Sequence, residues 1–204
     1  LRQRRSAEEY REVIESSLRD ASRLSALADD LLLLARADSN GLSMEMKEVS
    51  VSDVVGTVHR QLLPLAEAHR IRFSFENESE CLAYGDQFRL NQAFRNIAEN
   101  ALKYTPSGGS VTMTVTPVGH LIRTDVEDTG IGISEAELAK IFGRFYRVDH
   151  ARSRGDGGAG LGLAICDHII RAHDGRIEVA SAHGQGARFS VYLPSARALD
   201  EDGA

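Results

Sequence analysis

The chain has 204 residues, of which 42% are hydrophobic and 26% are charged, and its formal net charge is −6. These values are typical of a folded protein with its own core, and they exclude general disorder. The acidic balance argues against nucleic acid as the main partner, and no apolar run approaches the roughly 18 residues of a membrane span. We therefore expect no nucleic-acid contact and no membrane contact from this chain.

The cysteines and the first residues indicate a compartment. Cys81 and Cys166 are the only cysteines, and they lack CxxC spacing. They predict neither a disulfide framework nor a zinc site. The first five residues are basic and no apolar stretch follows them, so we expect no signal peptide and a cytoplasmic location.

A long helix is predicted at the start of the chain. Residues 6–9 (SAEE) fit a capping box, and no Gly or Pro follows before about residue 37. Small and apolar side chains recur at heptad spacing: Ile14, Ala21, Ala28 and Ala35 in one row, and Ser17, Leu24 and Leu31 in the other. This stripe favours one arm of a helical hairpin or dimeric bundle over residues 1–40. A helix packed on the domain that follows is the alternative.

The segment 41–195 is predicted to form a second domain, followed by a disordered tail over 196–204. The β-rich segments are 43–49, 71–76, 81–84, 110–117, 121–127, 176–181 and 187–193. The helical segments are 51–69, 87–103, 135–142 and 161–173. Two adjacent strands read as a hairpin through Gly119, and two more strands close the chain. This order favours an α+β fold, a mixed sheet with helices on one face.

The helix over 87–103 carries an unusual polar face. Asn96, Asn100 and Lys103 share one side of it, nearly opposite the apolar side. Asn is a poor residue for a helix interior, so two of them four residues apart favour a function over a solvated surface. Amide oxygens are hard neutral ligands that suit Mg²⁺.

Two glycine motifs follow. Asp128, Gly130 and Gly132 come directly after a strand, where glycines allow close backbone approach and the carboxylate can accept a hydrogen bond. A tight turn is the alternative. Residues 155–163 (GDGGAGLGL) open a helix whose free amides can bind an anion, unless they form only a flexible hinge. No strand precedes this motif, so we reject a dinucleotide fingerprint, and the P-loop pattern is absent.

In chain order, these pieces resemble the catalytic and ATP-binding domain of sensor histidine kinases, which has the Bergerat fold. Residues 96–104 resemble the N box, 128–133 the first glycine box and 141–147 the F box. Residues 157–163 resemble the second glycine box, and 181–189 resemble the closing glycine motif. The long first helix resembles the second arm of the dimerisation hairpin of that family.

The resemblance implies a site for ATP and Mg²⁺. Asn100, supported by Asn96, would hold the metal, and Lys103 would contact phosphate. Arg144 would face the γ-phosphate, and with Asn96 and Lys103 it forms the implied catalytic set. Such a site works by positioning and charge stabilisation.

The resemblance also implies the nucleotide contacts. Tyr104 would pack on the nucleotide, Asp128 would accept the adenine amino group, and Gly130 and Gly132 would make room for the ring. Phosphate-binding amides would come from Gly158, Gly160, Leu161 and Gly162.

Several residues depart from the family pattern. Ala159 and Ala187 replace common hydroxyls, and Gly143 replaces an acidic residue. The phosphoacceptor box opens with His-Glu or His-Asp; only His173-Asp174 has that pairing, and it lacks the rest of the box. We therefore expect the acceptor histidine upstream of Leu1, in a full-length protein that is a homodimer, is anchored in the inner membrane and signals to a response regulator.

Three alternatives remain at this point. Related Bergerat-fold ATPases carry a glutamate four residues before the metal-binding Asn, where this chain has Asn96, and Glu99 lies about 100° away around the helix. Anti-sigma serine kinases share the fold but lack the long helical arm. A non-catalytic nucleotide-binding or interaction module is opposed by the complete Asn, Asp and glycine set.

Overall fold

The computed structural model describes residues 7–39, 44–146 and 159–196 of the chain. The helices are α1 (Ala7–Ser39), α2 (Val51–Ala68), α3 (Gln87–Tyr104), α4 (Glu135–Leu138) and α5 (Gly162–Arg171). The strands are β1 (Lys47–Ser50), β2 (Arg72–Asn77), β3 (Leu82–Gly85), β4 (Ser110–Val118), β5 (Leu121–Asp128), β6 (Arg176–Ser181) and β7 (Ala187–Pro194).

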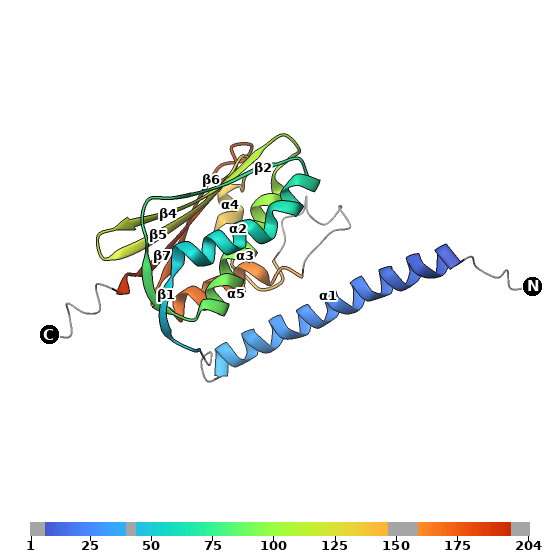
Figure 1. Ribbon diagram of the computed structural model, residues 1–204, viewed down its shortest axis with the longest axis horizontal. Helices are drawn as coiled ribbons and strands as arrows, with labels where there is room; N and C mark the ends of the chain where they lie inside the picture. The colour runs from blue at the N-terminus through green and yellow to red at the C-terminus, as the bar shows by residue number, and fades with distance from the viewer. Residues whose placement is uncertain (1–6, 40–43, 147–158, 197–204) are drawn as a thin grey trace, which may run out of the picture.

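The main sheet is mixed, as the sequence predicts. Its strand order is β2-β4-β5-β7-β6, with β2 parallel to β4 and all other neighbours antiparallel. β4 and β5 form the predicted hairpin, and Gly119 lies in its turn at a φ of 60°. The short strands β1 and β3 form a separate antiparallel pair. Figure 1 shows α2, α3 and α5 together on one face of the main sheet.

Local sequence signals set the ends of the helices that carry the site. Asp86 caps α3, because its Oδ1 accepts from the backbone N–H groups of Phe88 and Arg89. α3 ends at Tyr104, two residues before Pro106. One side of α3 is fully buried against the sheet and its neighbouring helices: Leu90, Ala93, Phe94, Ile97, Ala98, Ala101 and Leu102. The opposite side therefore remains open to carry polar groups.

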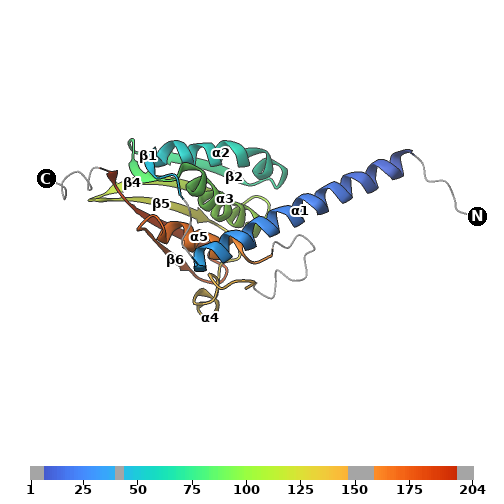
Figure 2. The ribbon, with the colours of Figure 1, turned by 90° about the horizontal axis from the view of Figure 1, so that it is seen from below.

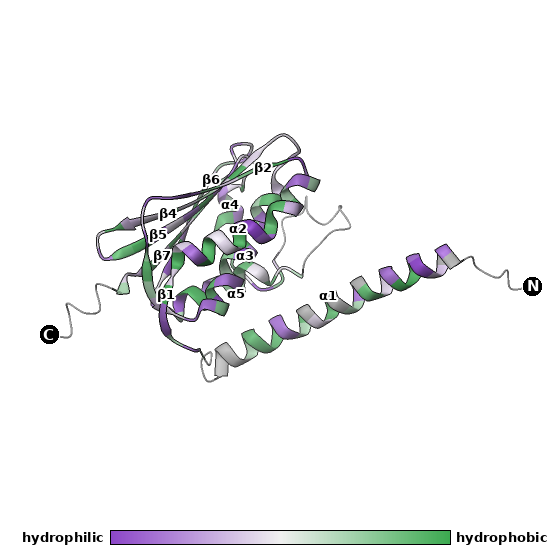
Figure 3. Ribbon diagram, in the orientation of Figure 1, coloured by the Kyte–Doolittle hydropathy of each residue, from purple (hydrophilic) through white to green (hydrophobic). Residues whose placement is uncertain are grey.

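α1 leaves the domain as a single extended rod (Figures 1 and 2). Near its C-terminal end, Leu33 and Leu34 are buried in the core of the domain. Further towards the N-terminus, apolar side chains face outwards; Ile14, Leu18 and Leu24 are each about two-thirds exposed. Figure 3 shows apolar and polar residues interleaved along this helix. The last turns of this helix thus pack on the domain and the earlier turns leave their apolar side chains uncovered, while the arm of a hairpin or bundle remains a prediction.

Three elements differ from the prediction by two residues or more at one end, and the other elements of the second domain differ by at most one. The strand expected over 43–49 is Lys47–Ser50, and the helix expected over 161–173 is Gly162–Arg171. The helix expected over 135–142 covers only Glu135–Leu138. Beyond it, Lys140 N–H bonds to Glu137 O and Gly143 N–H to Lys140 O, so tight turns with i to i+3 bonds replace the last α-helical turn.

Two further structural observations concern the predicted boundaries and the membrane. None of the described helices is long and apolar enough to cross a membrane. Most of the tail predicted over 196–204 lies outside the described residues, as does Ser6 of the predicted capping box. The division into domains at about residue 40 remains a prediction.

Candidate nucleotide-binding site

The polar face of α3 is the first part of the site. The Asn96 side chain reaches α5, where its Nδ2 donates to Gly162 O at 3.4 Å. Asn100, one turn further along α3, is half-buried, and its side chain makes no hydrogen bond to any described residue. Its amide oxygen is therefore available to a ligand, while Asn96 is partly engaged in holding two helices together.

The end of α3 packs on the first glycine motif. Tyr104 O accepts from Ile131 N–H at 3.2 Å. A Cβ added to Gly130 would lie 2.6 Å from the same carbonyl oxygen. The Lys103 ammonium lies 5.4 Å from the centre of the Tyr104 ring, within cation–π range. The N box and the first glycine box thus form one unit, joined through backbone contacts at Tyr104.

Asp128 is the best-defined group of the site. It is the last residue of β5, opposite Ala187 of β7, and only 7% of its surface is exposed. Its Oδ1 accepts from Gly130 N–H at 2.8 Å and from Ala187 N–H at 3.3 Å. Among the described residues, nothing donates to its other oxygen, Oδ2. The carboxylate is thus oriented by two backbone bonds and retains one oxygen for an external donor.

The charge state of Asp128 reflects this position. Burial raises the pKa of its carboxyl above the usual value, and the neighbouring Glu127 carboxylate acts in the same direction. The two backbone N–H bonds partly offset that rise. A buried carboxylate of this kind costs folding free energy, which is typical of a group retained for binding rather than for stability.

Close backbone packing explains why glycines surround Asp128. Gly132 has a φ of 67°, and a Cβ there would lie 2.0 Å from Ala182 O. Gly186 has a φ of 75°, and a Cβ there would lie 1.9 Å from Asp128 O. The resemblance implies that Gly130 and Gly132 make room for a ring, but in this structure the neighbouring space holds backbone atoms of Tyr104 and Ala182.

The second glycine box packs against the F box. Gly160 has a φ of 73°, and a Cβ there would lie 2.8 Å from Tyr146 O. Leu161 is buried, and α5 begins at Gly162. The start of α5 is therefore held against both α3 and the F box. Gly158, which the resemblance assigns to phosphate binding, lies outside the described residues.

The F box places Arg144 beside α5, where its Nη2 lies 3.4 Å from His168 Nε2. Phe142 packs against the core, as expected of an anchor. Phe145 does not, because 62% of its surface is exposed and its φ is 61°, a conformation that non-glycine residues rarely adopt. The resemblance implies that Phe142 and Phe145 anchor the lid rather than contact ATP, and this remains a prediction for Phe145 because the lid lies outside the described residues.

α3 thus contacts both other parts of the candidate site: its C-terminal end meets the first glycine motif at Tyr104, and Asn96 in its middle meets the start of α5. Gly186 was not predicted as a site residue. The residue that follows it, Ala187, donates its backbone N–H to Asp128. The signal was present in the sequence: a Gly-x-Gly turn enters a strand that pairs with the strand ending at Asp128. Only the register between β5 and β7 shows that this turn lies next to Asp128.

Comparison with known proteins agrees with this geometry. The family model for histidine kinase-, DNA gyrase B- and HSP90-like ATPases matches residues 85–197. That range includes the whole site, from the cap of α3 to the end of β7. This chain belongs to that ATPase family.

Within the family, the similarity is to sensor histidine kinases, which confirms the resemblance drawn from the motifs. The chain is 39% identical over 194 residues to the sensor histidine kinase CusS of Escherichia coli O157:H7, which covers 95% of this chain and 40% of CusS. It is 40% identical over 177 residues to the sensor histidine kinase RppB of Synechocystis, which covers 86% of this chain and 39% of RppB. The chain therefore spans about two fifths of the length of these relatives.

A solved structure supports the same assignment. Full-length ShkA in complex with AMPPNP superposes with a TM-score of 0.80 at 30% identity, over 95% of this chain and 40% of ShkA. The α+β fold of this ATPase is thus that of a histidine kinase catalytic domain.

Proposed function

We propose that this chain is the ATP-binding catalytic portion of a sensor histidine kinase, which transfers the ATP γ-phosphoryl group to a histidine outside these 204 residues. From that histidine the phosphoryl group would pass to an aspartate of a response-regulator receiver domain. The observation that carries the proposal is Asp128, whose carboxylate is oriented by two backbone bonds and keeps Oδ2 for an external donor. It lies at the end of β5, beside the glycine motif on which the C-terminal end of α3 packs.

The residues present fit adenine at one end of the site. Oδ2 of Asp128 can accept from an exocyclic amino group, which is the donor that adenine offers and guanine does not offer at the same ring position. A buried charged acceptor discriminates strongly, because a mismatched ligand leaves it without a partner. Tyr104, half-buried beside Gly130, can contact the nucleotide next to this carboxylate.

The residues present also fit Mg²⁺ and phosphate at the other end of the site, where α3 meets the start of α5. Asn100 has an uncommitted amide, and Asn96 keeps its Oδ1 while Nδ2 bonds to Gly162 O. Mg²⁺ commonly takes one or two protein oxygens and completes its shell with phosphate and water. Bound metal would neutralise phosphate charge. Lys103 and Arg144 would add positive charge, and the amides of Gly160, Leu161 and Gly162 would face the phosphates.

This residue set orients a phosphoryl donor but offers no obvious base for water. Asn96 stands where hydrolytic relatives of this fold carry a glutamate, and an amide cannot take a proton from water. Transfer therefore depends on a nucleophile delivered to the site. Holding two reactants in place contributes up to about 7–11 kcal/mol to a barrier, so hydrolysis should be slow without the delivered histidine.

The proposal extends to the assembly of the whole protein. The uncovered apolar side chains of α1, such as Leu18 and Leu24, would pair with a second copy in a homodimeric helical bundle. The acceptor histidine would lie in that bundle, and the full-length protein would be anchored in the inner membrane with this portion in the cytoplasm.

The test is phosphoryl transfer in trans. The chain is incubated with γ-labelled ATP and Mg²⁺, alone and with a helical hairpin that carries a His-Glu acceptor box. The hairpin should become labelled with an acid-labile phosphate, and the chain alone should show no stable label and only slow hydrolysis. A hairpin with His replaced by Ala is the control for the acceptor.

Two variants make the test specific. Asn100→Asp should abolish labelling, since it alters the proposed metal ligand. Arg95→Gln, on the exposed side of the same helix, should leave labelling unchanged, since among the described residues the Arg95 side chain bonds to Glu99 of its own helix. Labelling that survives Asn100→Asp, or stable histidine phosphate on the isolated chain, would contradict the proposal.

A further inference from the structure

Three polar contacts join α3 and its cap to α5 and the residues that follow it, and two of them involve no residue assigned to the nucleotide above. At the N-terminal end of α3, Asp86 N–H donates to Nε2 of His173 at 2.9 Å. In the middle, the Cys166 thiol donates to Ala93 O at 3.3 Å. Nearest the proposed phosphate end, Asn96 Nδ2 donates to Gly162 O at 3.4 Å.

The spacing of these contacts defines an antiparallel register. The first contact joins Asp86 to His173. The second joins Ala93, seven residues later in the chain than Asp86, to Cys166, seven residues earlier than His173. From the second to the third, α3 advances three residues and α5 moves back four. One further turn along α3 leads to Asn100, and the equivalent step on the other side leads to the glycine motif near Ala159. The three contacts therefore form a ladder whose open end is the phosphate site.

The contact at His173 is buried and fully defined. Only 3% of His173 is exposed. Because Nε2 accepts from Asp86 N–H, Nδ1 carries the proton, and it donates to Ile169 O at 2.7 Å. A Cβ added to Gly85 would lie 2.7 Å from Cδ2 of this ring, so the chain keeps space for the imidazole at this point.

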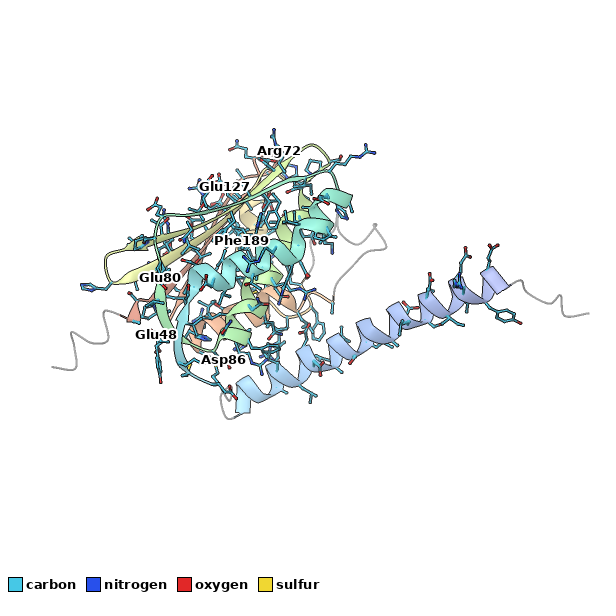
Figure 4. The ribbon with its side chains drawn as sticks, in the orientation of Figure 1. Glu48, Arg72, Glu80, Asp86, Glu127 and Phe189 are labelled. Carbon is cyan, nitrogen blue, oxygen red and sulfur yellow. The ribbon has the colours of Figure 1, made fainter. Side chains whose placement is uncertain are left out.

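The same contact reaches the segment that follows α1. Oδ2 of Asp86 accepts from Glu45 N–H at 3.0 Å, while its Oδ1 caps α3. Figure 4 labels Asp86 at the edge of the domain near the end of α1. His173 thus ties the end of α5 to a residue that also holds the start of α3 and the chain entering the domain.

The middle contact uses a thiol that remains protonated. Cys166 is fully buried, and burial raises the pKa of its thiol. The thiol therefore keeps the proton that it donates to Ala93 O. The neighbouring Asn96 side chain lowers the pKa of this thiol and partly opposes the effect of burial, so the second and third contacts of the ladder are neighbours.

We propose that His173 and Cys166 are positioning residues, which set the register of α3 against α5 and so hold Asn100 opposite the phosphate-binding glycines. This inference rests on the proposed function. A helix rises about 1.5 Å per residue, so a slip of a fraction of one turn would move the metal ligand away from the phosphate-binding amides. The adenine end would not move, because Asp128 is held by β5 and β7.

Nucleotide binding tests the proposal through two ligands that report on the two ends of the site. Dissociation constants are measured for MgATP by calorimetry and for adenosine by NMR titration, together with the melting temperature of each variant. Cys166→Ala and His173→Leu should weaken MgATP binding by about tenfold and change adenosine binding by less than about twofold.

Conservative variants and a matched control complete the design. Cys166→Ser keeps a donor to Ala93 O, and His173→Gln offers both an acceptor and a donor, so each should recover MgATP affinity to within about threefold of the parent. Cys81→Ala removes the other buried cysteine, which lies outside the α3–α5 pair, and should leave the ratio of the two constants unchanged.

The outcomes separate this inference from the function on which it rests. A selective loss of MgATP affinity with rescue by Ser and Gln supports it. Equal losses for both ligands, no loss for either, or the same selective loss in Cys81→Ala would overturn it. A parent chain that binds adenosine but not MgATP would contradict the proposed function itself.

Discussion

The two ends of the proposed nucleotide site are built in different ways. At the adenine end, strands β5 and β7 fix Asp128, and backbone atoms fill the space around Gly132 and Gly186 to within about 2 Å of a virtual Cβ. At the phosphate end, α3 and α5 meet through single side-chain contacts, and a Cβ added to Gly162 would find its nearest neighbour at 3.7 Å.

This difference separates two reasons for having a glycine. At the adenine end, glycine is required by the fold, because the protein packs against itself there. At Gly162, the fold has room for a side chain, so any requirement must come from the ligand. The adenine end therefore leaves little room for change, whereas at the phosphate end Gly160 is tightly packed against Tyr146 but Gly162, at the start of α5, is not.

The largest expected effect tests the rigidity of the adenine end. Gly186→Ala would drive Cβ into Asp128 O, and we expect the free energy of unfolding to fall by more than about 3 kcal/mol. Gly184 lies in the same turn at a φ of 79°, with nothing within 4 Å of a virtual Cβ, so Gly184→Ala should cost only about 1 kcal/mol of backbone strain.

Urea unfolding of both variants measures the difference directly. The two glycines share a left-handed conformation, so the comparison isolates the steric clash from the strain. Equal destabilisation by the two substitutions would show that conformation, rather than packing on Asp128, is the reason for glycine at 186.

The next effect concerns ligand recognition at the same end. Asp128→Asn keeps the size of the side chain and an oxygen for the bonds from Gly130 and Ala187. It turns an NH₂ group towards the position of the adenine amino group, so two donors would face each other. We expect ATP and adenosine to bind more weakly by about 1–3 kcal/mol, which calorimetry and NMR titration can measure. Unchanged affinity for both ligands would remove Asp128 from the adenine contact.

A smaller effect is expected at the phosphate end. Gly162→Ala places a better helix former at the start of α5, and its Cβ makes only ordinary contact with the Asn96 side chain. The free energy of unfolding should stay constant or rise by up to about 1 kcal/mol. MgATP binding, measured on the same sample, should fall if phosphate needs the glycine backbone. A destabilised variant would show that the two ends of the site do not differ as described.

Much of the fold follows from local sequence signals. Strands in the second domain alternate in hydrophobicity and end at turn residues. For this reason the bounds of every strand from β2 to β7 were predicted to within about one residue. The helix over 87–103 was predicted from an apolar face that runs through Leu90, Phe94 and Ile97, and the structure adds the Asp86 cap at its start. Such signals span only a few residues, and for that reason a single sequence reveals them.

The parts that were not predicted depend on contacts between distant segments. The bond from Asp86 to His173 joins residues 87 positions apart, and the clash that excludes a side chain at Gly186 arises from Asp128 across two strands. His173 was noticed only as a histidine without an acceptor box. Likewise, only tertiary packing shows that Phe142 lies against the core and that Phe145 is exposed.

The smallest expected effect is on stability, and it follows from the raised pKa of Asp128. A carboxyl whose pKa is higher in the folded state than in the unfolded state binds its proton more tightly when folded. Its stabilising contribution is therefore complete below the unfolded pKa of 3.8 and is lost as the pH rises through the folded pKa. At neutral pH the ionised carboxylate is then a net cost to the fold.

Asp128→Asn should be at least as stable as the parent at pH 7, with an advantage that shrinks as the pH is lowered towards 3.8. Urea unfolding of the two proteins across this range measures the difference. An advantage that grows on acidification would mean that the backbone bonds from Gly130 and Ala187 outweigh burial, and that the carboxylate stabilises the adenine end.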